Sequence, residues 1–202
     1  MKKIILTVAA VFALTFANAQ DKKESSEGFA QGDLFLTGTA SYNSVTRGDL
    51  KANDLTLSPG VGYFLTENLA LVGQLSISSG KDFVDDGTGG LIETKTSGFG
   101  IAAGVNYYWT PASKFSLSLG GNISYSSNKQ DFGGGDVTSK VIGVNVPLGL
   151  HYFVSDAFAL TTTWGGLGYS TDDNGGNGAD KTDSLSLGLD LSSVSFGLIY
   201  KL

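Results

Sequence analysis

The last stretch of the chain, residues 192–202, alternates between apolar and polar side chains. Every even position from Val194 to Leu202 is apolar, and the odd positions between them are mostly small or polar. A period of two over this length predicts a β-strand with one apolar face. This face continues to the chain terminus, which is unusual because chain ends ordinarily fray in water.

The same pattern recurs earlier, and each time it ends in neighbouring aromatic residues followed by a short polar turn and a new apolar run. The first tyrosines of these groups, Tyr63, Tyr107, Tyr152 and Tyr200, are separated by 44, 45 and 48 residues. Alternating strands with such a regular period predict repeated hairpins. Four hairpins make eight strands. A soluble propeller blade shares the period but does not explain a tyrosine at every second strand end.

Charge placement separates a membrane barrel from the soluble sandwich or lipocalin-like barrel that alternation alone also allows. Residues 98–126 contain one charged residue, Lys114, and residues 55–80 contain only Glu67; both fall in predicted turns. Average soluble domains are roughly 25% charged, whereas the polar positions here are Ser, Gly, Thr and Asn. We therefore expect an all-β fold, an eight-stranded antiparallel up-and-down transmembrane β-barrel with a narrow polar lumen.

Three irregularities are expected within these strands. Pro59 removes a ladder hydrogen bond and predicts a bulge or local bend in the second strand. In the seventh strand the apolar positions change parity across Gly165-Gly166, which makes it the poorest fit to the pattern. The eighth strand changes parity after Leu191. Since a one-residue slip exchanges the two faces, we expect a bulge near residues 190–193 or a strand that extends beyond the membrane.

The N-terminal residues predict export from the cytoplasm. Residues 1–19 have a basic start, an apolar core and the small-residue sequence Ala17-Asn18-Ala19, as in a cleaved signal peptide. Residues 20–30 are polar and aperiodic and predict a flexible periplasmic leader, which leaves 31–202 as the barrel. Loss of Lys2 and Lys3 leaves 11 basic and 19 acidic residues, a net charge of −8. An acidic chain does not suit nucleic acid, and a chain without cysteine has no disulfides or thiol chemistry.

Together these features resemble the small eight-stranded outer-membrane proteins of the OmpX/OmpA type. The run 59–64 (PGVGYF) supports the resemblance, and residues 195–202 look like the C-terminal assembly signal of such barrels. Leu202 departs from the usual terminal Phe. The resemblance implies the cell outer membrane of a Gram-negative envelope, contact with lipid and lipopolysaccharide, insertion by the barrel-assembly machinery, and a monomer. The signal residues are Ser195, Gly197, Tyr200 and Leu202.

Alternation assigns the aromatic residues at the strand ends to two sets. Aromatic side chains on the apolar face at one depth fit a belt at the membrane interface, and those on the other face point into the lumen. The predicted aromatic girdle is Tyr63, Tyr107, Trp109, Tyr152 and Tyr200. The predicted lumen floor is Phe64, Tyr108, His151 and Phe153.

Candidate chemistry is sparse. His151 is the only histidine, and no Ser/His/Asp spacing stands out, so we expect a lumen residue and no enzyme. The acidic loop 171–183 lacks the order of an EF-hand, and we expect no metal site and no cofactor. Arg47-Gly48-Asp49 is a tripeptide that some integrin ligands use, but Gly-Asp is also ordinary turn chemistry.

Three functions fit this sequence. The first is a structural or surface-interaction barrel that displays four extracellular loops on a non-conducting frame, with an unknown extracellular ligand. The second is a small channel for ions or small solutes, and the third is an outer-membrane enzyme. Lumen contents distinguish the first two, and paired catalytic groups would indicate the third.

Overall fold

The computed structural model describes residues 28–48, 50–85, 90–176, 178–189 and 195–202. Among these residues, no helix has the length and apolar character needed to cross a bilayer. The strands are β1 (Leu34–Arg47), β2 (Leu50–Phe64), β3 (Leu69–Asp85), β4 (Leu91–Trp109), β5 (Phe115–Asp131), β6 (Asp136–Phe153), β7 (Phe158–Asp172), β8 (Thr182–Leu189) and β9 (Ser195–Lys201).

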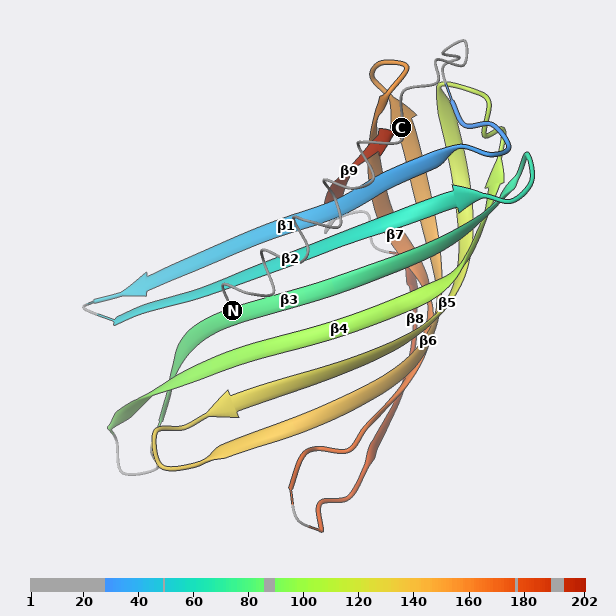
Figure 1. Ribbon diagram of the computed structural model, residues 1–202. Helices are drawn as coiled ribbons and strands as arrows, with labels where there is room; N and C mark the ends of the chain where they lie inside the picture. Colours follow the sequence, from blue (N-terminus) through green and yellow to red (C-terminus); the bar gives the residue numbers. More distant parts are fainter. Residues whose placement is uncertain (1–27, 49, 86–89, 177, 190–194) are drawn as a thin grey trace.

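The strands form a closed, eight-stranded antiparallel β-barrel, as the sequence predicts (Figure 1). Strands β1 to β7 each pair with the next one along the chain. Strands β8 and β9 share the eighth position, because β8 pairs with β7 and β9 pairs with both β7 and β1. The β1–β9 seam is short, running only from Phe35–Lys201 to Gly38–Leu198.

Connections of two kinds lie at opposite ends of the barrel. Residues 65–68, 110–114 and 154–157 make short turns at one end, here called the short-turn end. The opposite end, here called the long-loop end, carries the tips of β1–β2, β3–β4, β5–β6 and β7–β8. Only the β7–β8 connection, residues 173–181, is long, so the other predicted loops consist mainly of strand extensions. Strands β3 to β6 contain 17 to 19 residues, more than the roughly 9–11 that a tilted strand needs to cross a bilayer. These strands therefore extend well past the membrane.

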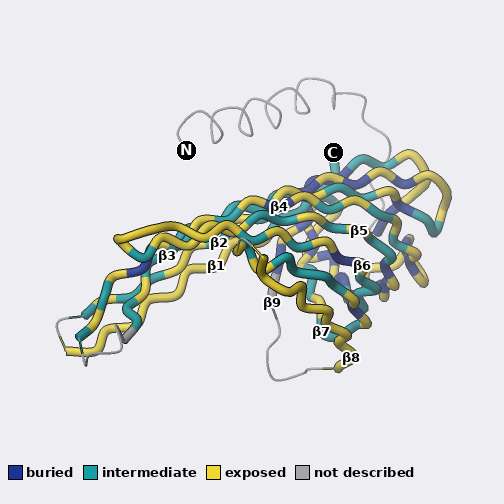
Figure 2. Tube along the Cα trace, turned by 90° about the horizontal axis from the view of Figure 1, so that it is seen from below, coloured by how far each residue is buried: buried dark blue, intermediate teal, exposed yellow. Residues whose placement is uncertain are grey.

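Exposed and less exposed positions alternate along the strands (Figure 2). Outward positions are large and apolar, as at Ile101, Ile123 and Ile142, which are 46%, 65% and 63% exposed on the isolated chain. Inward positions are mainly Gly, Ser, Asn and Thr. An outer face without hydrophilic residues is suited to hydrocarbon, so the observed alternation agrees with the membrane assignment.

The parity change in the seventh strand has a local cause. The β6–β7 register shifts between Leu148 and Gly149, because Leu148 pairs with Gly165 and Gly149 with Thr163. Trp164 is therefore an extra residue in β7, a β-bulge. Beyond it, the positions that point outward have the opposite parity. Leu160 lies outward on one side of the bulge, and Leu167 lies outward on the other.

The bulge expected near residues 190–193 lies outside the described residues, but the flanking pairs show an insertion. Ser195 pairs with Thr163, and Leu189 pairs with Gly165. Between these two pairs, β7 contains a step of two residues, from Thr163 to Gly165, whereas the β8–β9 side contains a step of six, from Leu189 to Ser195.

Pro59 interrupts a ladder without shifting it. The pairs on either side of the interruption, Leu57–Ile77 and Gly60–Gln74, keep the same β2–β3 register. On its other side Pro59 lies opposite Gly38 in a continuous β1–β2 register. The bulge that the sequence offered as one alternative at Pro59 is therefore absent, and the other alternative, a local bend, stays a prediction. Proline removes a donor but inserts no residue here.

Candidate functional site

A cluster of aromatic rings fills the barrel at the short-turn end. The predicted floor residues Phe64, Tyr108 and Phe153 are at most 1% exposed, and His151 is buried beside them. The ring centroids of Phe64 and Tyr108 are 5.0 Å apart, and those of Tyr108 and His151 are 4.9 Å apart. The structure thus brings together all four residues that alternation assigned to the lumen floor.

Two further rings complete this floor, and sequence alternation did not identify them. Phe35 of β1 is buried 5.8 Å from Phe64, between ring centroids. A Cβ atom at Gly62 would overlap the ring of Phe35, so only glycine leaves room for it. Phe29 is also buried and comes from the segment before β1, which the sequence assigns to the leader. The polar composition of residues 20–30 gave no signal for this contact.

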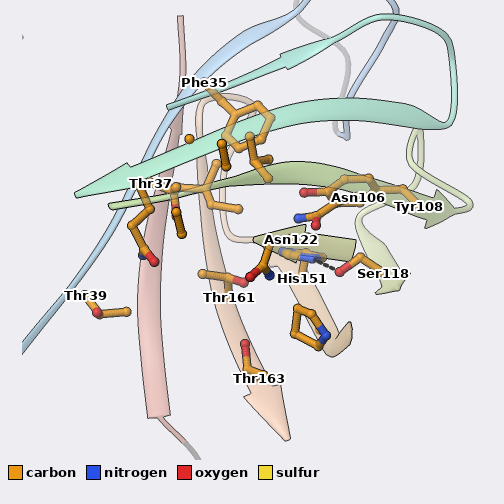
Figure 3. A pocket seen from close by; sticks show the side chains of 18 residues that line it. Phe35, Thr37, Thr39, Asn106, Tyr108, Ser118, Asn122, His151, Thr161 and Thr163 are labelled. Carbon is orange, nitrogen blue, oxygen red and sulfur yellow. Dashed lines mark hydrogen bonds between the residues drawn. The ribbon is translucent and has the colours of Figure 1, made fainter. Parts of the chain in front are cut away.

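A cavity of about 200 Å³, lined by uncharged polar side chains and by apolar ones, lies above the floor. Figure 3 shows amide, hydroxyl and imidazole side chains converging on it from β1, β4, β5, β6 and β7. None of the lining residues carries a carboxylate, a lysine or an arginine. The polar side chains named in the figure are Thr37, Thr39, Asn106, Tyr108, Ser118, Asn122, His151, Thr161 and Thr163.

One hydrogen bond in this cavity joins a possible nucleophile to a possible base. The Ser118 hydroxyl lies 2.8 Å from Nε2 of His151 (Figure 3). His151 Nδ1 is buried and has no hydrogen-bond partner among the described residues. In a catalytic triad, a carboxylate bonded to that nitrogen would orient the imidazole. The pair is therefore a dyad without the third member.

A second cavity of about 330 Å³ lies toward the long-loop end. Its lining is mainly hydroxyl and amide side chains from β3 to β6, joined by Lys129, Asp172 and Asn174. Acidic side chains of loop 171–183 accept hydrogen bonds from the loop and from the neighbouring strand β6. Asp173 Oδ1 accepts from the backbone amides of Lys140 and Gly175, and Asp183 Oδ1 accepts from Thr171. Within the described segments, no three His, Cys, Asp or Glu side chains are grouped to hold a metal ion.

Ion pairs lie on the strand extensions at the long-loop end. The carboxylate of Glu93 lies 3.0 Å from Nζ of Lys81 and 3.6 Å from Nζ of Lys95. In a separate pair, Nζ of Lys129 lies 2.7 Å from Oδ2 of Asp136. The Lys81 hydrogen bond lowers the pKa of Glu93 below its ordinary value. Likewise, the hydrogen bond between Lys129 and Asp136 lowers the pKa of Asp136 and raises that of Lys129. These pairs are exposed and so contribute little to stability.

The predicted girdle residues lie near the short-turn end. Tyr63, Tyr107, Trp109 and Tyr152 are exposed on the outer face. Tyr200 is partly exposed and contacts Phe158, with 4.8 Å between ring centroids. Lys114 extends over the Tyr152 ring at 5.6 Å, a cation–π geometry. The structure places the girdle as sequence parity expects, and its role at the membrane interface stays a prediction.

The C-terminal residues close the barrel. Ser195 and Gly197 pair with β7, Tyr200 pairs with both Leu36 and Phe158, and the amide of Leu202 donates to the carbonyl of Leu34 at 2.9 Å. At Gly197, a Cβ would lie 3.0 Å from the carbonyl oxygen of Gly38, so glycine permits the close approach of β1. Recognition of these residues as an assembly signal stays a prediction.

A closed barrel with an apolar outer face and a polar interior defines a transmembrane β-barrel protein. The chain belongs to the outer membrane protein beta-barrel domain family, whose model matches residues 6–192. It is accordingly an outer-membrane protein of a Gram-negative envelope.

Solved structures of other outer-membrane barrels are similar to this chain. Neisserial surface protein A is 20% identical with a TM-score of 0.49, covering 86% of this chain and 99% of that one. OprG from Pseudomonas aeruginosa is 15% identical with a TM-score of 0.47, covering 88% and 99%. Ail, the attachment invasion locus protein of Yersinia pestis, is 13% identical with a TM-score of 0.43, covering 85% and 99%. No curated protein matches the chain.

Proposed function

We propose that this protein is a non-conducting outer-membrane barrel with a structural or surface-interaction role. The observation that carries the proposal is the floor of Phe29, Phe35, Phe64, Tyr108 and Phe153, five rings that are each at most 1% exposed. An eight-stranded barrel has an interior only about wide enough for its own side chains. Rings packed across that interior leave no continuous water path.

In this role the strand extensions and loops at the long-loop end are the surface displayed outside the cell. They are polar, and the β3–β4 and β5–β6 extensions are joined by the ion pairs of Glu93 and Asp136. Small barrels usually place short turns in the periplasm and longer loops outside. Lysine side chains such as Lys95 and Lys129 lie where they could approach the phosphates of lipopolysaccharide. The extracellular ligand stays unidentified, and the protein acts as a monomer.

We further propose that the barrel is not an enzyme. Ser118 and His151 are hydrogen-bonded but buried, and the cavity beside them offers no carboxylate to orient the imidazole. The Ser118 hydroxyl is satisfied by this hydrogen bond, as buried polar groups usually are. The pair therefore rigidifies the interior rather than activating a nucleophile.

The alternative function, a small channel, is favoured by one observation: the cavities of about 200 and 330 Å³ above the floor. Liposome swelling with glycerol and small sugars separates the two proposals. The refolded protein should admit these solutes no faster than empty liposomes. Swelling that exceeds the empty control and falls as solute size increases would instead support the channel.

A further inference from the structure

The segment just before β1 crosses the short-turn end and is tied down on both sides. This strap, Gly28 to Asp33, begins beside the β4–β5 turn, where the Phe29 amide donates to the carbonyl of Pro111 at 2.7 Å. Lys201 Nζ of β9 donates to the carbonyl of Gly28 at 2.7 Å. The carbonyl of Gly28 and the amide of Phe29 belong to one peptide group, so the two bonds hold the start of the strap between the β4–β5 turn and β9.

Phe29 is the ring at the centre of the floor. Its centroid lies 4.7 Å from that of Phe64, 4.8 Å from Phe153, 5.2 Å from Phe35 and 5.4 Å from Tyr108. These distances are all within the range of favourable aromatic pairs. The four partner rings come from four different strands, and Phe29 fills the space that they enclose.

The strap also requires glycine at its first residue. Gly28 has a φ of 98°, a left-handed conformation that side chains rarely adopt. A Cβ there would lie 2.5 Å from both the carbonyl carbon of Ala112 and the carbonyl oxygen of Pro111. Since both contacts are backbone atoms of a turn, any side chain at residue 28 would lift the strap from the floor.

We propose that the strap is a plug that opens a latent path through the barrel when it is displaced. The other floor rings lie in strands. Phe35 is paired on both sides, whereas Phe64, Tyr108 and Phe153 are each paired on one side and hydrogen-bonded through their backbone amides on the other. Phe29 lies outside every strand and is held by ring packing and a few hydrogen bonds. It is therefore the one described floor ring that leaves without breaking the sheet. This inference rests on the proposed function, since it takes the barrel as closed while the plug is seated.

Lys201 serves as the latch of this plug. Its ammonium group is largely buried, donates to Gly28, lies 4.0 Å from a carboxylate oxygen of Asp33 and sits 5.6 Å over the Phe153 ring. Asp33 Oδ2 in turn accepts from the Ala30 amide at 2.8 Å. One lysine thus joins both ends of the strap to the closing strand.

Single-channel recording in planar bilayers tests the plug with three variants. Phe29→Ala removes the ring, Gly28→Ala lifts the strap, and Lys201→Met removes the latch while keeping every ring. All three should gain discrete current steps that the parent lacks, with Lys201→Met opening least often. Phe99→Ala, on the outer face, and Gly134→Ala, where a Cβ meets nothing within 4 Å, are matched controls that should stay silent.

Folding is checked by the mobility shift of unheated barrel on gels, so that only folded variants are compared. If Phe29→Ala or Gly28→Ala does not fold, the recordings of Lys201→Met test the plug on their own, because this variant keeps all the aromatic rings of the floor. Silent recordings from folded variants beside a silent parent would overturn the plug and leave the proposed function standing. A parent that conducts steadily would overturn the proposed function, and a current unchanged by the three substitutions would then overturn the plug as well.

Discussion

Lys201 Nζ donates a 2.7 Å hydrogen bond to the carbonyl of Gly28, so the penultimate residue of the chain holds the segment that precedes the first strand. This contact joins the two ends of the barrel sequence next to the short β1–β9 seam. The closing strand therefore stabilises the floor as well as the wall.

The two faces of one strand should respond differently to charge. Ile123 points outward and Asn122 lines the cavity, and they are adjacent in β5. Ile123→Arg should lower the free energy of unfolding by about 2–4 kcal/mol, because the guanidinium enters the hydrocarbon near the midplane. Asn122→Arg should lower the free energy of unfolding by less, because polar side chains such as Asn145 lie beside it. Reversible urea unfolding in lipid vesicles measures both, and equal losses would contradict the assignment of faces.

Truncating the floor should destabilise the barrel more than truncating the outer face. Phe64 is buried among the rings of the floor. Phe64→Ala should lower the free energy of unfolding by about 3–5 kcal/mol, because it removes buried apolar surface and leaves a cavity. Phe99→Ala, the matched outward change, leaves no internal cavity and should cost clearly less. The same vesicle unfolding assay compares the two variants. A smaller loss at Phe64 than at Phe99 would mean that the floor is not packed as described.

The short turns should lie in the periplasm. Because the natural chain has no cysteine, a single cysteine reports on its own position. Ser113→Cys, in the β4–β5 turn, should not react with a membrane-impermeant maleimide on intact cells and should react once the outer membrane is opened. Gly134→Cys, in the β5–β6 tip, should react on intact cells. The reverse labelling pattern would show that the barrel has the opposite orientation in the membrane.

The small contribution of the Lys129–Asp136 pair should be present at neutral pH and should disappear in acid. Its hydrogen bond holds the pKa of Asp136 below the ordinary value, so the pair's contribution is present above the unfolded pKa and is lost as pH falls through the folded pKa. NMR titration of the Asp136 carboxyl should show a midpoint that rises in Lys129→Met. The difference should shrink at high salt because both groups are exposed. An identical midpoint in the two proteins would mean that the pair does not form.

The sequence predicted the barrel well because its outer face must be apolar at every second position. That requirement repeats in each strand, so strand number, the inward positions of Phe64, Tyr108, His151 and Phe153, and the outward positions of the girdle residues follow from parity. Details that depend on a partner did not follow. The bulge at Trp164 exists only relative to β6, and it appeared in the sequence as an unexplained parity change. Phe29 was missed because a single aromatic in a polar segment has no period to reveal its contacts.

The measurement that tests the account most directly is the planar-bilayer current of the unmodified, refolded protein across a range of voltages. A floor of packed rings with the strap seated predicts no conductance. A stable current of porin size, carried by barrels that show the folded gel mobility, would contradict the closed floor.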